Sequence, residues 1–178
     1  MKIHFSSIAV VGAGAMGQGI AQIAAQAGSH VWLLDSKPGA ADKARQAIQQ
    51  QWAKLAAKGR VTEEQGQAWN QQLQIANTLA DLGPCQLVIE AVVERLEVKQ
   101  ALFAELERTL PANVVWATNT SSLSVTAIAA ALQQPERLAG FHFFNPVPLM
   151  KVVEVVAGLK TAPALCQALT AYAREMGH

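Results

Sequence analysis

The sequence predicts an α/β fold in which a doubly wound, mostly parallel sheet carries helices on both faces. Short apolar runs alternate with amphipathic segments along nearly the whole chain, which is the pattern of strands joined by helical crossovers. The first apolar run ends in a glycine-rich turn that opens a helix. The composition, 51% hydrophobic and 15% charged among 178 residues, is typical of one globular domain with a sizeable core.

Seven strands are predicted from short runs of apolar and often β-branched residues. The second run ends in Asp35, and the fourth contains a carboxylate, Glu90. The predicted strands cover residues 8–11, 30–34, 73–76, 87–91, 114–117, 138–143 and 151–156.

Helices are predicted where apolar residues recur every three or four positions between start and stop signals. Gly28 is a C-cap for the first helix, and Ser36 is an N-cap for the second, with Pro38 in its first turn. Thr62 marks the start of a third, and Ser124 caps a later short one. The predicted helices cover residues 16–27, 36–58, a segment from 62, 95–109, 124–132 and 163–176.

Charge and cysteine content exclude several classes of function. Lys and Arg number 14 and Asp and Glu 13, so the net charge of +1 provides no basic surface for nucleic acid. Cys85 and Cys166 are far apart and form no Cys-x-x-Cys motif, so neither a disulfide scaffold nor a metal site is expected. No apolar run reaches the 18 residues of a membrane helix, and glycines interrupt the first one, so we expect a cytoplasmic protein.

The glycine-rich turn has the spacing G-x-G-x-x-G, at Gly12, Gly14 and Gly17. Between a strand and a helix this spacing is typical of Rossmann-type dinucleotide sites. Gly12 permits the tight turn, Gly14 lets the backbone approach a pyrophosphate, and Gly17 lets the helix pack on the strand. Asp35 ends the second strand, where a carboxylate can bind a ribose hydroxyl and repel a 2′-phosphate, so the expected cofactor is NAD. The alternative for Asp35 is an N-cap of the next helix.

A second group of polar residues lies near the end of the chain. The segment 119–122 (NTSS) follows the fifth strand at the edge where open α/β sheets place their ligands, although it also suits a polar turn. His142 stands among aromatic residues and Glu154 within an apolar strand. Individually these are typical of a core histidine and a solvated strand edge. Together they suggest a carboxylate that holds one imidazole nitrogen and leaves the other free as a base.

Four parts of the sequence together resemble the L-3-hydroxyacyl-CoA dehydrogenase family: the glycine turn, residues 119–122, the string 142–148 (HFFNPVP) and the string 151–155 (KVVEV). The resemblance extends over essentially the whole chain. It is greatest to the 3-hydroxybutyryl-CoA type, because members fused to enoyl-CoA hydratase usually have Ser at the position of Asn145.

The resemblance implies a role for each matching residue. His142 is the expected catalytic base, Glu154 its orienting carboxylate, and Ser121 a contact to substrate and nicotinamide. The remaining expected contacts are Asn145 to the acyl-CoA, Glu94 and Lys99 to the cofactor, and Lys58 to CoA phosphates. For Glu94, Lys99 and Lys58 the alternative is a solvated helix with regularly spaced charges. Gln51 stands where some members have a CoA-contacting Ser.

The resemblance also implies an activity, the interconversion of (S)-3-hydroxyacyl-CoA and 3-oxoacyl-CoA with NAD in fatty-acid or related acyl-CoA degradation. Residues 1–178 match the NAD-binding domain, and the helical domain through which members dimerise and complete the acyl-CoA site has no counterpart in them. We therefore expect this chain alone to bind NAD but to turn over little substrate. The alternatives are a non-catalytic NAD-binding module and a relative of the β-hydroxyacid or sugar-acid dehydrogenases.

Overall fold

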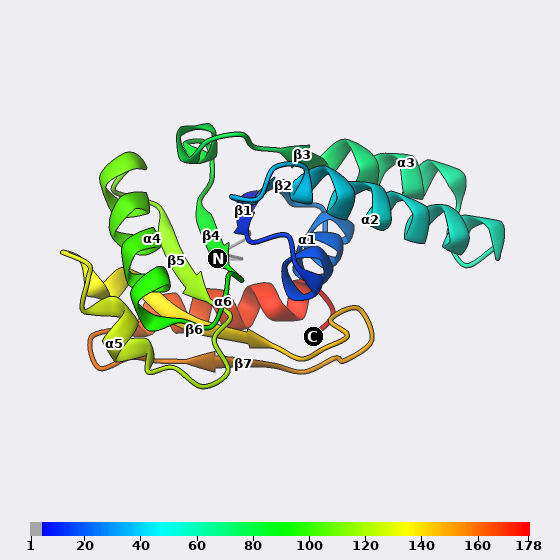
Figure 1. Ribbon diagram of the computed structural model, residues 1–178. Coiled ribbons are helices and arrows are strands. Elements are labelled where there is room, and N and C mark those ends of the chain that lie inside the picture. The colour runs from blue at the N-terminus through cyan, green and yellow to red at the C-terminus, as the bar shows by residue number, and fades with distance from the viewer. Residues whose placement is uncertain (1–4) are drawn as a thin grey trace.

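A computed structural model describes residues 5–178 and shows seven strands in one sheet (Figure 1). The order of the strands is β3-β2-β1-β4-β5-β6-β7, and every neighbouring pair is parallel except β6 and β7. This confirms the predicted fold class. The strands are β1 (Ser7–Val11), β2 (His30–Leu34), β3 (Leu73–Ile75), β4 (Leu87–Glu90), β5 (Val115–Thr118), β6 (Leu138–Phe143) and β7 (Val153–Val156).

Helices cover both faces of this sheet (Figure 1). One face packs against α1, α2 and α6, and the other against α4 and α5. The helices are α1 (Ala15–Gln26), α2 (Ala40–Ala57), α3 (Glu63–Gln72), α4 (Leu96–Thr109), α5 (Val125–Ala129) and α6 (Pro163–Glu175), with 3₁₀ turns η1 (Leu79–Leu82) and η2 (Pro135–Arg137).

Strand β1 shows why the central strands are apolar on both sides. Ile8 and Val10 pack into the core under α1 and α6, whereas Ala9 and Val11 pack into the core under α4. All four are buried because side chains alternate between the two covered faces of a parallel sheet. A continuous apolar run is therefore the expected signature of this strand.

Helix α2 begins later than predicted. Ser36 is not its N-cap, and Pro38 precedes the helix, which starts at Ala40 after Gly39 in a left-handed conformation (φ +73°). The reason is local, because the Asp35 carboxylate accepts a hydrogen bond from the Lys37 N–H at 2.8 Å and holds the intervening residues in a turn. At Thr62, by contrast, the predicted helix start is confirmed by a capping box with Gln65.

The boundaries of other elements shift as well. Helix α5 ends at Ala129 instead of residue 132, and β7 begins at Val153 instead of residue 151. The turn η1 was not predicted, because four residues are too few to show a periodicity. Within residues 5–178, no helix is both long and apolar enough to cross a membrane.

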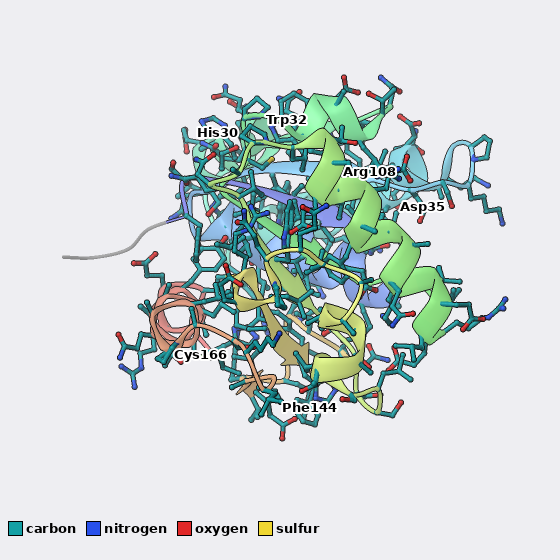
Figure 2. The ribbon with its side chains drawn as sticks, turned by 90° about the vertical axis from the view of Figure 1, so that its left-hand side faces the viewer. His30, Trp32, Asp35, Arg108, Phe144 and Cys166 are labelled. Carbon is teal, nitrogen blue, oxygen red and sulfur yellow. The ribbon has the colours of Figure 1, made fainter. Side chains whose placement is uncertain are left out.

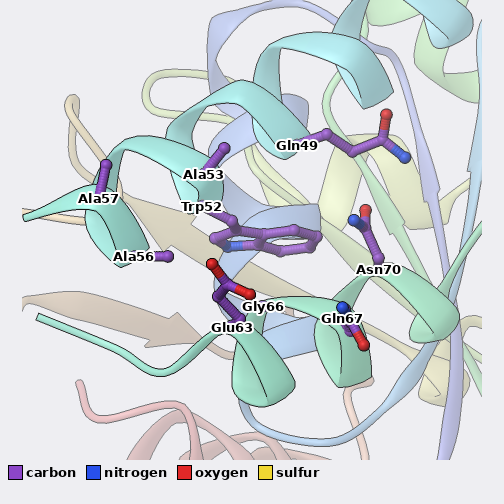
Figure 3. Close-up of a pocket in the computed structure, with 9 residues that line it drawn as sticks. All are labelled: Gln49, Trp52, Ala53, Ala56, Ala57, Glu63, Gly66, Gln67 and Asn70. Atoms are coloured by element: carbon purple, nitrogen blue, oxygen red, sulfur yellow. The ribbon is translucent and has the colours of Figure 1, made fainter. Parts of the chain in front are cut away.

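Helices α2 and α3 form a hairpin that extends beyond the sheet (Figure 1). Trp52 on α2 packs against Trp69 on α3, with ring centroids 5.8 Å apart. A pocket of about 340 Å³ opens between the two helices, and Trp52 and Glu63 lie in its wall (Figure 3). Trp52 belongs to the core on the α1 side of the sheet, and Trp69 packs against it, so the hairpin is anchored to the main core.

Candidate active site

The glycine turn joins β1 to α1 at the carboxyl edge of the sheet. Gly12 has a positive φ of +105°, and a Cβ on it would lie 2.5 Å from the Ala91 carbonyl oxygen. A Cβ on Gly17 would lie 1.7 Å from the Gly12 carbonyl oxygen. Neither position therefore accepts a side chain, because the backbones of the turn, α1 and β4 approach too closely.

Gly14 differs from its two neighbours. A Cβ there would meet no atom within 4 Å, and Gly14 caps α1 without a side-chain hydrogen bond to the first turn. Open space thus lies beside the backbone N–H groups that begin α1. This arrangement suits an anionic diphosphate, which binds such N–H groups at the positive end of the helix dipole.

Asp35 lies immediately after β2, the strand that runs between His30 and Asp35 in Figure 2. One carboxylate oxygen, Oδ2, accepts a hydrogen bond from the Ala13 N–H at 2.7 Å. Asp35 is therefore bound to the glycine turn and does not cap α2. With Gly12 and Gly14 it lines a cavity of about 410 Å³. A carboxylate here fits the ribose of NAD, and the glycine turn fits its diphosphate.

A second cavity of about 320 Å³ contains most of the remaining predicted residues. Ala91 and Val92 line both cavities, so the two adjoin. The predicted residues in the wall of the second cavity are Glu94, Lys99, Ser121, His142 and Asn145.

His142 and Glu154 face each other across the only antiparallel strand pair among the described residues, β6 with β7. His142 Nδ1 lies 2.8 Å from Glu154 Oε2, and the Phe144 ring packs against the imidazole with centroids 4.5 Å apart. The His142 side chain is 16% exposed, whereas Glu154 is 57% exposed on the outer strand. The carboxylate thus fixes a nearly buried ring, and Nε2 has no hydrogen-bond partner among residues 5–178.

Glu94 holds the loop that carries Ser121. Its Oε1 accepts hydrogen bonds from the Thr120 hydroxyl, from the Ser121 N–H at 3.0 Å and from the Ser122 N–H at 3.3 Å. Burial raises the pKa of Glu94, but the hydrogen bond from Thr120 and the charge of Lys99 lower it more, so its pKa falls to about 2. Glu94 is therefore a carboxylate at neutral pH, and it fixes the loop as an acceptor.

Two residues of the site were not predicted as functional. Asn119 Oδ1 accepts the Phe143 N–H at 2.8 Å and so connects the end of β5 to the strand of His142. Glu90 is fully buried and binds Lys99 Nζ at 2.5 Å. The sequence signal for Glu90 was its position inside an apolar strand, nine residues before a lysine on the next helix.

Lys58 and Asn145 differ in their positions. Asn145 is exposed but lies in the wall of the His142 cavity. Lys58 is an exposed residue that follows the last turn of α2, at the far end of the hairpin. The structure does not bring Lys58 to either of the two cavities, and its contact with CoA phosphates stays a prediction.

Known proteins are similar to this chain in sequence and in fold. The family model "3-hydroxyacyl-CoA dehydrogenase, NAD binding domain" matches residues 7–178. A 3-hydroxyadipyl-CoA dehydrogenase of Escherichia coli is 44% identical over 95% of this chain and 36% of its own length. A probable 3-hydroxybutyryl-CoA dehydrogenase of Bacillus subtilis is 41% identical over 98% of this chain and 61% of its own length.

Solved structures agree with these relatives. A crystal structure of 3-hydroxybutyryl-CoA dehydrogenase from Escherichia coli superposes with a TM-score of 0.95 at 42% identity, covering 98% of this chain and 37% of that one. A crystal structure of (S)-3-hydroxybutyryl-CoA dehydrogenase from Ralstonia eutropha superposes with a TM-score of 0.93 at 33% identity, and the match covers 98% of this chain and 62% of that one. The chain thus spans between about a third and two thirds of the length of these relatives. It belongs to the family of NAD-binding domains of 3-hydroxyacyl-CoA dehydrogenases.

Proposed function

We propose that this chain supplies the NAD site and the acid–base pair of an enzyme that interconverts (S)-3-hydroxyacyl-CoA and 3-oxoacyl-CoA. The contact between His142 Nδ1 and Glu154 Oε2 carries this proposal. It lies at a cavity that adjoins the glycine turn, so a base and a hydride acceptor can act on the same carbon atom. The names of the relatives support the acyl-CoA substrate.

The proton moves through His142. With Nδ1–H donated to Glu154, Nε2 is the free nitrogen and takes the proton of the substrate's 3-hydroxyl group. Glu154 stabilises the imidazolium that results, and in the reverse direction the imidazolium donates to the 3-oxo oxygen. Gly12, Gly14 and Asp35 would hold NAD, and the bound cofactor would supply the acceptor for the hydride of C3.

The neighbouring residues position the substrate. Ser121 lies on a loop that Glu94 holds by several hydrogen bonds. Asn145 follows His142 by three residues and lies in the same cavity wall. Both residues can direct polar atoms toward the reacting carbonyl or the acyl-CoA. Their contribution is to orient the substrate, which lowers the entropic part of the barrier.

The finer parts of the proposal concern the whole protein. We expect it to act in the cytoplasm, in fatty-acid or related acyl-CoA degradation such as β-oxidation, and to form a homodimer through a further helical domain. Cys85 and Cys166, both free thiols, are compatible with a reducing compartment.

Single-turnover reduction of acetoacetyl-CoA, with NADH bound to excess protein, tests the proposal. The unmodified chain should oxidise NADH slowly, in keeping with the low turnover expected of it, and His142→Ala should slow this step further by about 10²- to 10⁴-fold, the usual contribution of a general base. His30→Ala removes an exposed histidine at the start of β2, the end of the strand away from Asp35, and should leave the rate of NADH oxidation unchanged.

The substrate arms separate the alternatives. Oxidation of NADH by free acetoacetate, at the rate found with its CoA thioester, would favour a β-hydroxyacid dehydrogenase instead. NADH binding without any turnover would favour a non-catalytic NAD-binding module. Equal rates for His142→Ala and the unmodified chain would contradict the assignment of the base.

A further inference from the structure

Three charged side chains meet in and beneath the wall of the His142 cavity. Glu90 at the end of β4 is 0% exposed and Lys99 on α4 is 1% exposed. Lys99 Nζ lies 2.5 Å from Glu90 Oε1 and 3.2 Å from Glu94 Oε2. We call these three residues the acid–lysine cluster.

The hydrogen bonds fix the charge of the cluster. Glu90 accepts from Lys99 Nζ, from the Thr118 hydroxyl at 2.7 Å and from the Val92 N–H at 2.7 Å. Glu94 also acts only as a hydrogen-bond acceptor, and its donors are Lys99 and the loop that contains Thr120. A carboxylate that is surrounded by donors needs no proton of its own. Two carboxylates and one ammonium therefore leave one net negative charge.

This net charge acts on the cavity mainly through Glu94. Glu90 and Lys99 are buried and offset each other as an ion pair, whereas Glu94 is 37% exposed and lies in the cavity wall, so solvent screens it only in part. Glu94 and Lys99 also line the cavity that contains His142. The cluster thus faces the place where our proposed function requires the nicotinamide ring.

The two states of the cofactor differ at this ring. The nicotinamide ring of NAD⁺ is positively charged and that of NADH is neutral, whereas the adenosine and diphosphate parts are the same. We propose that the acid–lysine cluster, through its net negative charge, shifts the binding preference of this site toward the oxidised cofactor. This inference rests on the proposed function, because it requires NAD to bind with its nicotinamide near His142.

Calorimetric titrations with NAD⁺ and with NADH, without any acyl-CoA, test the inference. Glu90→Gln removes the net negative charge and should raise the ratio of the NAD⁺ Kd to the NADH Kd by about tenfold, as expected for one unit charge beside a partly buried site.

A double variant separates charge from structure. Glu90→Gln with Lys99→Met restores the original net charge, so its Kd ratio should return to within about twofold of the original value. Replacing a buried ion pair by neutral residues is often tolerated, so this variant should fold even where Glu90→Gln does not. Adding Glu94→Gln to the double variant then removes one negative charge and should again raise the ratio by about tenfold.

Glu97→Gln is the matched control. Glu97 lies on the same helix but is 64% exposed and paired with Arg95, so its removal should leave the ratio unchanged. If Glu90→Gln weakens both cofactor forms equally, the residue is merely structural and the inference is wrong. If the unmodified chain binds neither form, the proposed function fails as well, which distinguishes the two failures.

Discussion

The cavity beside Gly12 and the cavity around His142 adjoin at Ala91 and Val92, but the chain builds them in different ways. The first is lined by the end of β1, the glycine turn, Asp35 and Ser36 after β2, and apolar residues of the segment from Ala91 to Leu102, and its closest approaches are between backbone atoms of the turn. The second combines side chains from α1, the segment after β4, α4, the loop after β5 and the end of β6, and Glu154 of β7 binds the His142 ring in its wall. A site made of backbone groups requires residues without side chains where two backbone segments approach closely. A site made of side chains requires segments that are distant in the sequence to be held together.

The largest effect is expected at the glycine turn. Gly17→Ala would place a Cβ 1.7 Å from the Gly12 carbonyl oxygen, so α1 must move away from β1. We expect the free energy of unfolding to fall by about 3 kcal/mol or more, as measured by urea denaturation.

Gly14→Ala is the matched control in the same turn. Its Cβ meets no atom within 4 Å, so the stability should change by less than about 0.5 kcal/mol, while the affinity for NAD should fall because the added methyl group fills the open space. If both variants lost the same stability, close backbone approach would not explain the turn.

Replacing Asp35 should have an intermediate effect, which we expect in cofactor affinity. Asp35→Ala removes the proposed ribose contact and also the acceptor of the Ala13 N–H, so the NAD affinity should fall about tenfold and the preference for NAD over NADP should narrow. Equal affinity of the unmodified chain for NAD and NADP would exclude this role. Titration calorimetry with both cofactors provides the measurement.

Glu94 should show the smallest effect, in the pH dependence of stability. Its pKa is about 2 in the folded chain and rises toward the ordinary 4.5 on unfolding. The carboxylate therefore stabilises the fold fully above about pH 4.5, and this contribution is lost as the pH falls toward 2.

Urea unfolding between pH 7 and pH 3 measures this contribution. Relative to Glu94→Gln, the unmodified chain should lose stability progressively below about pH 4.5. The loss should stay below about 1 kcal/mol, because Glu94 is 37% exposed and solvent screens it. A constant difference across this range would show that Glu94 is not the group that titrates.

The same contrast explains what could be predicted from the sequence. The glycine turn and Asp35 are local, so their spacing indicated their positions. The predicted start of α2 at Ser36 was wrong, because the Asp35 side chain holds the following residues in a turn and the helix begins only at Ala40. Glu90 was seen only as an unusual residue, because its partner Lys99 comes from the following helix and its third donor from β5.

His142 and Glu154 could be paired in advance only because they stood on neighbouring predicted strands. Their register, which places them directly opposite, depends on the β6–β7 connection, and no sequence pattern specified it. The contact between Lys58 and CoA phosphates stays a prediction, since the hairpin carries this residue away from both cavities.

A double-mutant cycle of His142→Ala and Glu154→Gln tests most directly whether the side-chain site acts as one unit beside an independent cofactor site. Single-turnover reduction of acetoacetyl-CoA and the Kd for NAD are measured on the same preparations. We predict that the double variant is about as slow as His142→Ala alone, by about 10²- to 10⁴-fold, and that every variant keeps its NAD Kd within about twofold. Single effects that multiply in the double variant, or a parallel loss of NAD binding, would contradict the account.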